Sequence, residues 1–278
     1  NVAANLRAMG ARAVVCGRVG NDPAGRELLR HLKAEGIETD GITADAETLT
    51  TVKTRILAER QQVCRVDHER PLMWDRRRLA EACTLVARIA RGADGLIVED
   101  YGKGYVVQAV VDAAQRAAAA RGIPTGLDPK ENHPLRVRGF TVATPNRREA
   151  FAAAGRHDPG PAPVPLRDAA LLETARRLRR QWTPEQLLVT LGPHGMLLLA
   201  GTRPVHIPTR AIEVYDVSGA GDTVIAVDVL ALAAGADPVE AAELANYAAG
   251  VVVAKLGTAT CTPAELLRHM RECGAPET

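Results

Sequence analysis

The chain has 278 residues, of which 46% are hydrophobic and 24% are charged, and its formal net charge is +2. This composition is ordinary for a soluble globular protein, and the small charge argues against a nucleic-acid-binding surface. No charge-free apolar run reaches about 18 residues, so no membrane span is expected. The scattered cysteines show neither zinc nor disulfide spacing, which favours a reducing cytoplasm as the location (Cys16, Cys64, Cys83, Cys261, Cys273).

Strand-like and helix-like segments alternate along the chain. We expect strands at 13–16, 96–99, 125–127, 141–143 and 187–191, and helices at 24–35, 75–91, 106–121, 147–154 and 223–234. The Pro- and Gly-rich segment 155–165 is predicted to be a surface loop. The alternation predicts a single α/β domain over residues 1–278, with a mainly parallel sheet sandwiched by helices.

Residues 50–67 do not fit a buried parallel sheet. Val52, Thr54 and Ile56 fall on one side of a predicted strand, with Lys53, Arg55 and Leu57 on the other. This alternation predicts a half-exposed hairpin. We interpret it as a small β lid whose surface also pairs two subunits, because an exposed strand edge invites strand pairing.

The segment Asp216-Val217-Ser218-Gly219-Ala220-Gly221-Asp222 precedes an apolar run that reads as a buried helix. A Gly-Ala-Gly turn at a helix N-terminus presents backbone N–H groups to an anion. Asp222 would then lie where a base is needed for transfer of a phosphate to a hydroxyl group. The alternative interpretation is an ordinary glycine turn followed by a helix-favouring aspartate.

Further polar groups follow the predicted strands, where ligands gather in open α/β sheets. Lys103 lies in a Gly-Lys-Gly loop and Lys130 follows another strand, and either can be a solvated surface lysine. Asn146 and Glu149, three residues apart, could hold water around Mg²⁺ or form a plain helix cap. The Arg-rich segment 176–180 is predicted to be a solvated helix face.

Taken together, these motifs resemble those of ribokinase-type (phosphofructokinase B) sugar kinases. The resemblance rests on the segment 216–222 and on Asn146-Arg147-Arg148-Glu149, the N-x-x-E motif of the family. Segments 100–104, 128–130, 143–146, 214–224 and 248–258 are similar to D-glycero-β-D-manno-heptose 7-phosphate kinases, which are also the kinase halves of bifunctional ADP-heptose synthesis proteins. The resemblance extends over essentially the whole chain.

The resemblance implies a ribokinase-like fold and phosphorylation of the anomeric hydroxyl of the heptose 7-phosphate by ATP with Mg²⁺. The product would be the 1,7-bisphosphate, for ADP-heptose and lipopolysaccharide core synthesis. Asp222 would be the base, Gly219, Ala220 and Gly221 would hold the transferring phosphoryl group, and Asn146 and Glu149 would hold Mg²⁺ through water. Nucleotide contacts are expected from the N-x-x-E motif (Asn146, Arg147, Arg148, Glu149). They are also expected from five residues further along the chain (Thr190, Gly192, Gly195, Asn246, Gly257). Substrate contacts are expected from two asparagines and four cations (Asn1, Asn5, Lys53, Arg55, Lys103, Lys130).

Two departures from the family pattern are visible. Ser218 stands where threonine is usual, which keeps the hydroxyl. Residues 1–5 match only the tail of the motif Gly-Gly-Ala-x-Asn-Val-Ala-x-Asn, so the first strand and its substrate-binding aspartate are expected to be missing. Two other functions stay open: another kinase of this fold, and a catalytically silent sugar- or nucleotide-binding relative.

Overall fold

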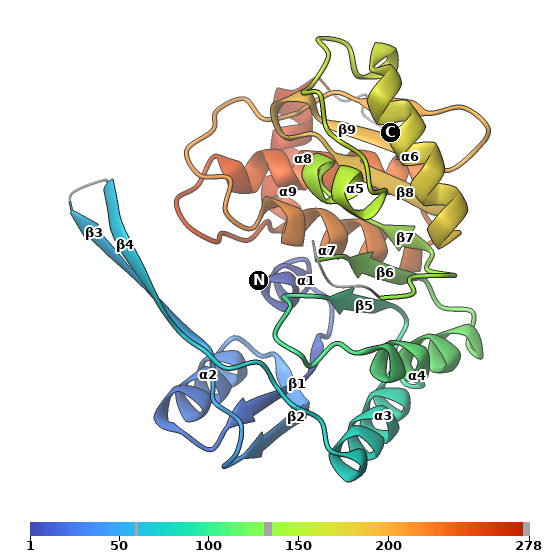
Figure 1. Ribbon diagram of the computed structural model, residues 1–278. Helices are drawn as coiled ribbons and strands as arrows, with labels where there is room; N and C mark the ends of the chain where they lie inside the picture. The colour runs from blue at the N-terminus through green and yellow to red at the C-terminus, as the bar shows by residue number, and fades with distance from the viewer. Residues whose placement is uncertain (59–60, 131–134, 275–278) are drawn as a thin grey trace.

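A six-stranded sheet in the order β10-β9-β8-β7-β6-β5 forms the main body of the computed structural model, which describes residues 1–58, 61–130 and 135–274 (Figure 1). Strands β5 (Leu96–Glu99), β6 (Thr125–Asp128), β7 (Val142–Ala143) and β8 (Gln186–Thr190) are parallel. Strands β9 (Met196–Leu199) and β10 (Val205–Ile207) continue the sheet in antiparallel fashion. The predicted mainly parallel sheet is confirmed.

Helices bury both faces of this sheet, as the alternating contacts of β8 demonstrate. Leu188 belongs to a core cluster that residues of α7 (Ala220–Ala233), α8 (Pro238–Val253), α9 (Pro263–Glu272) and α1 (Val2–Ala8) complete. Leu187 and Val189 pack on the other face with α5 (Arg147–Ala153) and α6 (Ala169–Trp182). Successive residues of a strand point to opposite faces, so a continuous apolar strand requires this double cover. Helices α3 (Arg76–Ala90) and α4 (Gln108–Ala119) cover the β5 end.

Strands β1 (Val14–Gly20) and β2 (Glu38–Asp45) form a separate parallel pair, connected by α2 (Pro23–Ala34). Asp22 caps α2 by accepting a hydrogen bond from the Gly25 N–H at 2.7 Å. The parallel strands are therefore divided between two sheets, which the sequence does not predict.

The hairpin of β3 (Val52–Ala58) and β4 (Gln61–His68) belongs to neither sheet and projects from the body (Figure 1). Its strands pair antiparallel from Val52 opposite His68 to Ala58 opposite Gln61. A hairpin outside the main sheet is the arrangement that the alternating pattern predicts. Residues 59–60, between the two strands, lie outside the described residues.

Helix α7 begins at Ala220, three residues before the predicted start, and most of its length is buried. The other predicted strands and helices agree with the structure to within a few residues, and two short 3₁₀ turns at Pro165–Arg167 (η1) and Gly192–His194 (η2) complete the elements. No helix in the described part of the chain is long and apolar enough to cross a membrane.

Candidate active site

The N-terminus of α7 has the backbone geometry that an anion site requires. Gly219 is the N-cap and has φ +79°, in the left-handed region that favours glycine. A Cβ atom there would lie 2.2 Å from Asn1 Nδ2, which donates to the Gly219 carbonyl at 3.1 Å. Any larger residue would therefore be strained and would displace Asn1.

Two of the three backbone amides predicted to hold the phosphoryl group are free to donate a hydrogen bond. Among the described residues, the Gly219 and Gly221 N–H groups have no hydrogen-bond partner, whereas the Ala220 N–H donates to the Val217 carbonyl at 3.3 Å. Asp216 orders the turn before the helix by accepting from the N–H groups of Ser218 at 2.9 Å and Gly257 at 3.0 Å. An anion at this helix N-terminus would find free donors and the positive end of the helix dipole.

Three carboxylates from three elements meet beside this turn. Glu99 ends β5 and Asp128 ends β6, and the parallel register places them side by side. Asp222 comes from the first turn of α7. One carboxylate oxygen of each residue lies within 4.8 Å of those of the other two. The close packing of α7 on β6 helps to bring Asp222 here, since a Cβ at Gly126 would lie 2.6 Å from the Val229 side chain.

The cluster is too crowded for all its carboxylates to be charged. Burial, together with the neighbouring Asp128 and Asp222 charges, raises the pKa of Glu99 to about 9. Burial and the Glu149 charge likewise raise the pKa of Asp128 to about 7, although the Thr144 hydroxyl donates to Asp128 at 3.2 Å. The Glu99 carboxyl is therefore protonated at neutral pH.

These residues fit a divalent cation. Both Glu99 oxygens are buried and have no hydrogen-bond partner among the described residues. A hard cation such as Mg²⁺ takes carboxylate oxygens as ligands, and its charge would oppose both the burial and the repulsion that raise these pKa values. Glu99, Asp128 and Asp222 could hold such an ion directly.

Asn146 and Glu149 form a capping box at the start of α5. The Asn146 side chain accepts from the Glu149 N–H at 3.0 Å, and the Glu149 carboxylate accepts from the Asn146 N–H at 2.9 Å. The helix-cap alternative therefore describes their hydrogen bonds. The cap also holds Glu149 close enough to raise the Asp128 pKa, so the N-x-x-E motif adjoins the carboxylate cluster, and its role toward Mg²⁺ stays a prediction.

The glycine loop after β8 lies next to this cap. Thr190 pairs with Asn146 in an isolated parallel bridge and donates its N–H to the Pro145 carbonyl at 3.1 Å. Gly192 and Gly195 both have positive φ, and a Cβ at Gly195 would lie 2.1 Å from the Ile207 carbonyl oxygen. Gly195 is thus required by close packing against β10, and Thr190 is brought beside the N-x-x-E motif.

Arg147 is engaged within the fold rather than open to a nucleotide. Its guanidinium binds Asp158 through two nitrogens and Asp168 through a third at 2.7 Å, and it also donates to the Gly160 carbonyl at 2.8 Å. These contacts hold the loop 155–165 against α5. Arg147 thus has a structural role, its contact with a nucleotide stays a prediction, and Arg148 is exposed on the same helix.

Two asparagines that were predicted to contact ligands form hydrogen bonds within the fold. Asn5 is fully buried, donates to the Asn1 carbonyl at 3.2 Å and accepts from the Cys261 N–H at 3.3 Å. Asn246 is 4% exposed and donates to the Pro208 carbonyl at 2.6 Å. Asn5 therefore supports α1 instead of facing a sugar, and Asn246 supports the loop that follows β10. Gly257 also has an internal partner, Asp216.

Two of the lysines predicted to contact the substrate converge on one carboxylate. Lys53 from β3 lies 3.5 Å from Glu69, and Lys103 from the loop after β5 lies 2.5 Å from the same side chain. These contacts connect the base of the hairpin to the β5 loop, and the Lys103 ammonium holds the Glu69 pKa below its usual range. Arg55 and Lys130 are exposed, and the Lys130 charge partly opposes the rise in the Asp128 pKa.

Sequence reasoning missed Glu99, Asp128 and Glu69 as site residues. Glu99 and Asp128 are the last residues of two consecutive predicted strands, and parallel strands end at the same edge of a sheet. That position was the available signal for them. No sequence signal connects Glu69 to Lys103, because their contact depends on how the hairpin leaves the body.

Comparison with known proteins shows which family the chain resembles over most of its length. The model of the pfkB family carbohydrate kinases matches residues 1–265. The chain is 40% identical over 269 residues to the bifunctional protein HldE of Pelobacter propionicus, covering 96% of the chain and 54% of that relative. It is 43% identical over 270 residues to HldE of Caulobacter sp. strain K31, covering 96% of the chain and 53% of the relative. The chain thus spans about half the length of these curated relatives.

Solved structures share the fold at lower identity. Phosphofructokinase-2 from Escherichia coli, in complex with potassium, superposes with a TM-score of 0.78 at 19% identity, covering 98% of this chain and 85% of that one. Ribokinase from Arabidopsis thaliana, complexed with ribose and ATP, gives 0.77 at 19% identity, covering 97% and 85%. Together, the matched length, the relatives and the fold place the chain in the pfkB family of carbohydrate kinases.

Proposed function

We propose that the protein transfers the γ-phosphate of ATP to the anomeric hydroxyl of D-glycero-β-D-manno-heptose 7-phosphate. The observation that carries this proposal is the meeting of Asp222, the free amides of Gly219 and Gly221, and the Glu99–Asp128 pair at one edge of the sheet. The choice of sugar rests on the identity to HldE proteins over 96% of the chain.

In this reaction Asp222 accepts the proton of the attacking hydroxyl. The Gly219 and Gly221 N–H groups, together with the α7 dipole, stabilise negative charge on the transferring phosphoryl group. Phosphoryl transfer needs mainly positioning and electrostatic stabilisation, and both come here from backbone that Asp216 and Asn1 hold in place. Glu99 and Asp128, with Asn146 and Glu149 nearby, would hold Mg²⁺, which would neutralise phosphate charge and leave Asp222 to act as the base.

The substrate's own phosphate is read by Lys53 and Lys103. Their shared partner Glu69 shows that both ammonium groups reach one position, and charge-assisted bonds to phosphate are stronger than neutral ones. Because Lys53 belongs to the hairpin, binding of a phosphate there would draw the hairpin toward the body. The hairpin then acts as a lid that excludes water from the reaction.

The outer face of the hairpin pairs two subunits. Val52, Ile56 and Val66 are 37%, 48% and 54% exposed, and the strand register puts them on one face, opposite Lys53 and Asp67. A two-stranded ribbon with an apolar face is marginal in water by itself, so a second copy of the chain is the partner that we propose for it.

The test is ADP release over a panel of heptose 7-phosphate, fructose 6-phosphate and ribose, with Asp222→Asn as the inactive control. Heptose 7-phosphate should have the highest kcat/KM. A clear preference for fructose 6-phosphate or ribose would support kinase activity but contradict heptose 7-phosphate as the substrate. ATP binding without turnover of any sugar would favour a silent binding protein.

A further inference from the structure

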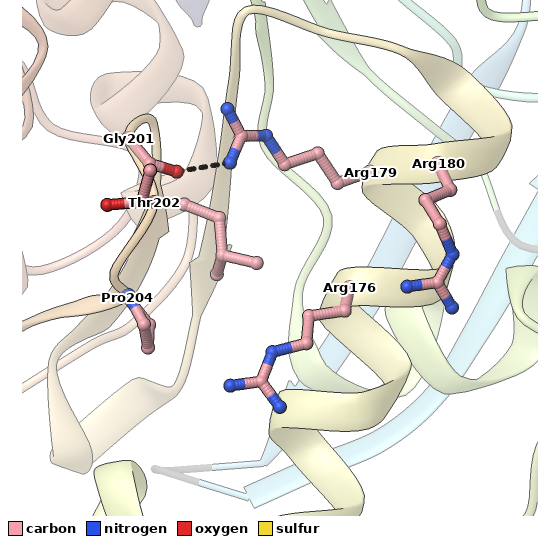
Figure 2. A pocket seen from close by; sticks show the side chains of 7 residues that line it. Arg176, Arg179, Arg180, Gly201, Thr202 and Pro204 are labelled. Carbon is pink, nitrogen blue, oxygen red and sulfur yellow. Dashed lines mark hydrogen bonds between the residues drawn. The ribbon is translucent and has the colours of Figure 1, made fainter.

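A second charged site lies on α6, where the sequence predicts only a solvated helix face. Three of its arginines, Arg176, Arg179 and Arg180, line a hollow of about 370 Å³ (Figure 2). Leu199 and the turn between β9 and β10 form the opposite wall, with Gly201, Thr202 and Pro204. The hollow therefore has cationic side chains on one wall and a backbone turn on the other.

This hollow is separate from the candidate active site. Leu199 at the end of β9 pairs with Leu187 near the start of β8, whereas Thr190 at the other end of β8 adjoins Asn146. Three residues of strand span about 10 Å. The two sites lie at opposite edges of the same sheet.

The arginines in the hollow lack close carboxylate partners, although the Arg180 charge is near enough to Glu173 to help lower the pKa of that carboxyl. No carboxylate in the described ranges forms an ion pair with Arg176, Arg179 or Arg180. The nearby Glu173 instead pairs with Arg156 at 2.7 Å. Arg179 donates to the Gly201 and Ala200 carbonyls at 2.5 Å each. These neutral acceptors orient its guanidinium and leave its charge in place.

Helix electrostatics explains only part of this arrangement. Arg179 and Arg180 lie in the last turn of α6, where cations complement the helix dipole. Arg176 lies before that turn, and at an i,i+4 spacing it repels Arg180. An anion between the two guanidinium groups would convert this repulsion into attraction.

We propose that the hollow binds a small molecule that carries at least two phosphate groups. Planar guanidinium groups match phosphate oxygens in pairs, and Arg179 is already oriented by the turn. The volume lies within the usual range for small-molecule sites, about 300–1,000 Å³. Inorganic pyrophosphate and a nucleoside diphosphate share this chemistry, and the experiment separates them.

The test follows the Gly201 and Thr202 amide signals in ¹H–¹⁵N spectra during titration with pyrophosphate and, separately, with ADP. Local signals report this hollow even when ADP also binds elsewhere. The double variant Arg176→Gln/Arg180→Gln removes two charges from the hollow. The double variant Arg167→Gln/Arg177→Gln removes two exposed charges outside it and is the matched control. Thermal unfolding of both variants verifies that they fold.

Pyrophosphate should shift both signals, the hollow variant should weaken binding at least tenfold, and the control should stay within twofold. ADP binding ten times tighter than pyrophosphate would identify a nucleotide as the ligand, and equal binding would identify the phosphates alone as the recognised feature. No shift at Gly201 and Thr202, or an equal loss in both double variants, would overturn the proposal. Neither outcome bears on the kinase activity, which ADP release measures separately.

Discussion

Asp228 is a carboxylate in the core of α7 that should make stability depend on pH. It is fully buried, and neither oxygen has a hydrogen-bond partner among the described residues. Burial raises its pKa from 3.8 to about 7. The folded chain therefore favours the protonated form, and we predict that this aspartate lowers stability as the pH rises.

The size of the effect follows from the two pKa values. Below the pKa of the unfolded chain, near 4, Asp228 is protonated in both states and does not lower the free energy of unfolding. As the pH rises from there to about 7, the free energy of unfolding falls progressively. At 1.36 kcal/mol per pKa unit, the difference between 3.8 and about 7 corresponds to about 4 kcal/mol above pH 7. Such a loss is a large fraction of the usual stability of a domain.

Urea unfolding of wild type and Asp228→Asn between pH 4 and 9 measures this effect. The variant should gain stability relative to wild type by about 1.4 kcal/mol per pH unit up to pH 7 and then keep a constant difference. Burial of the amide in the Asp228→Asn variant has a cost that does not depend on pH, so it shifts the curve of stability against pH without changing its slope. Asp40→Asn, at an exposed position, is the control and should give no such slope. Parallel curves for Asp228→Asn and wild type would refute the reasoning.

Three further predictions concern the proposed kinase. Asp222→Asn should lower kcat by about 10²–10⁴-fold, while its ATP affinity, measured by calorimetry, should stay within about threefold of wild type. A near-normal kcat would exclude Asp222 as the base. Lys103→Ala should raise KM for the sugar phosphate about tenfold or more and leave KM for ATP unchanged, whereas equal changes would place Lys103 at the nucleotide. Light scattering should give a dimer at micromolar concentration and a monomer for Ile56→Lys/Val66→Lys; a monomeric wild type would remove the subunit-pairing proposal.

Much of the fold was predictable because its signals are local. Strand β5 is predicted with its observed bounds, and the amphipathic helix α3 to within one residue at each end. Strand β2 was missed because Glu38–Asp45 is polar along most of its length and pairs only with β1. The division of the parallel strands into two sheets depends on pairing partners, which no local pattern specifies.

The backbone at the start of α7 was predictable from the sequence alone, because the apolar run indicates a helix and glycine accepts the left-handed conformation at its N-cap. Gly219 has the positive φ that its position requires, and Asp222 follows in the first turn. The surroundings were decided by tertiary structure. Glu99 and Asp128 become neighbours of Asp222 only through the register of β5 and β6, and their raised pKa values follow from that burial and proximity. Arg147 and Asn5 likewise have ligand-binding side chains, yet each finds its partners inside the fold. Side-chain type determines which bonds a residue can form, and the packed chain determines which partners are within reach.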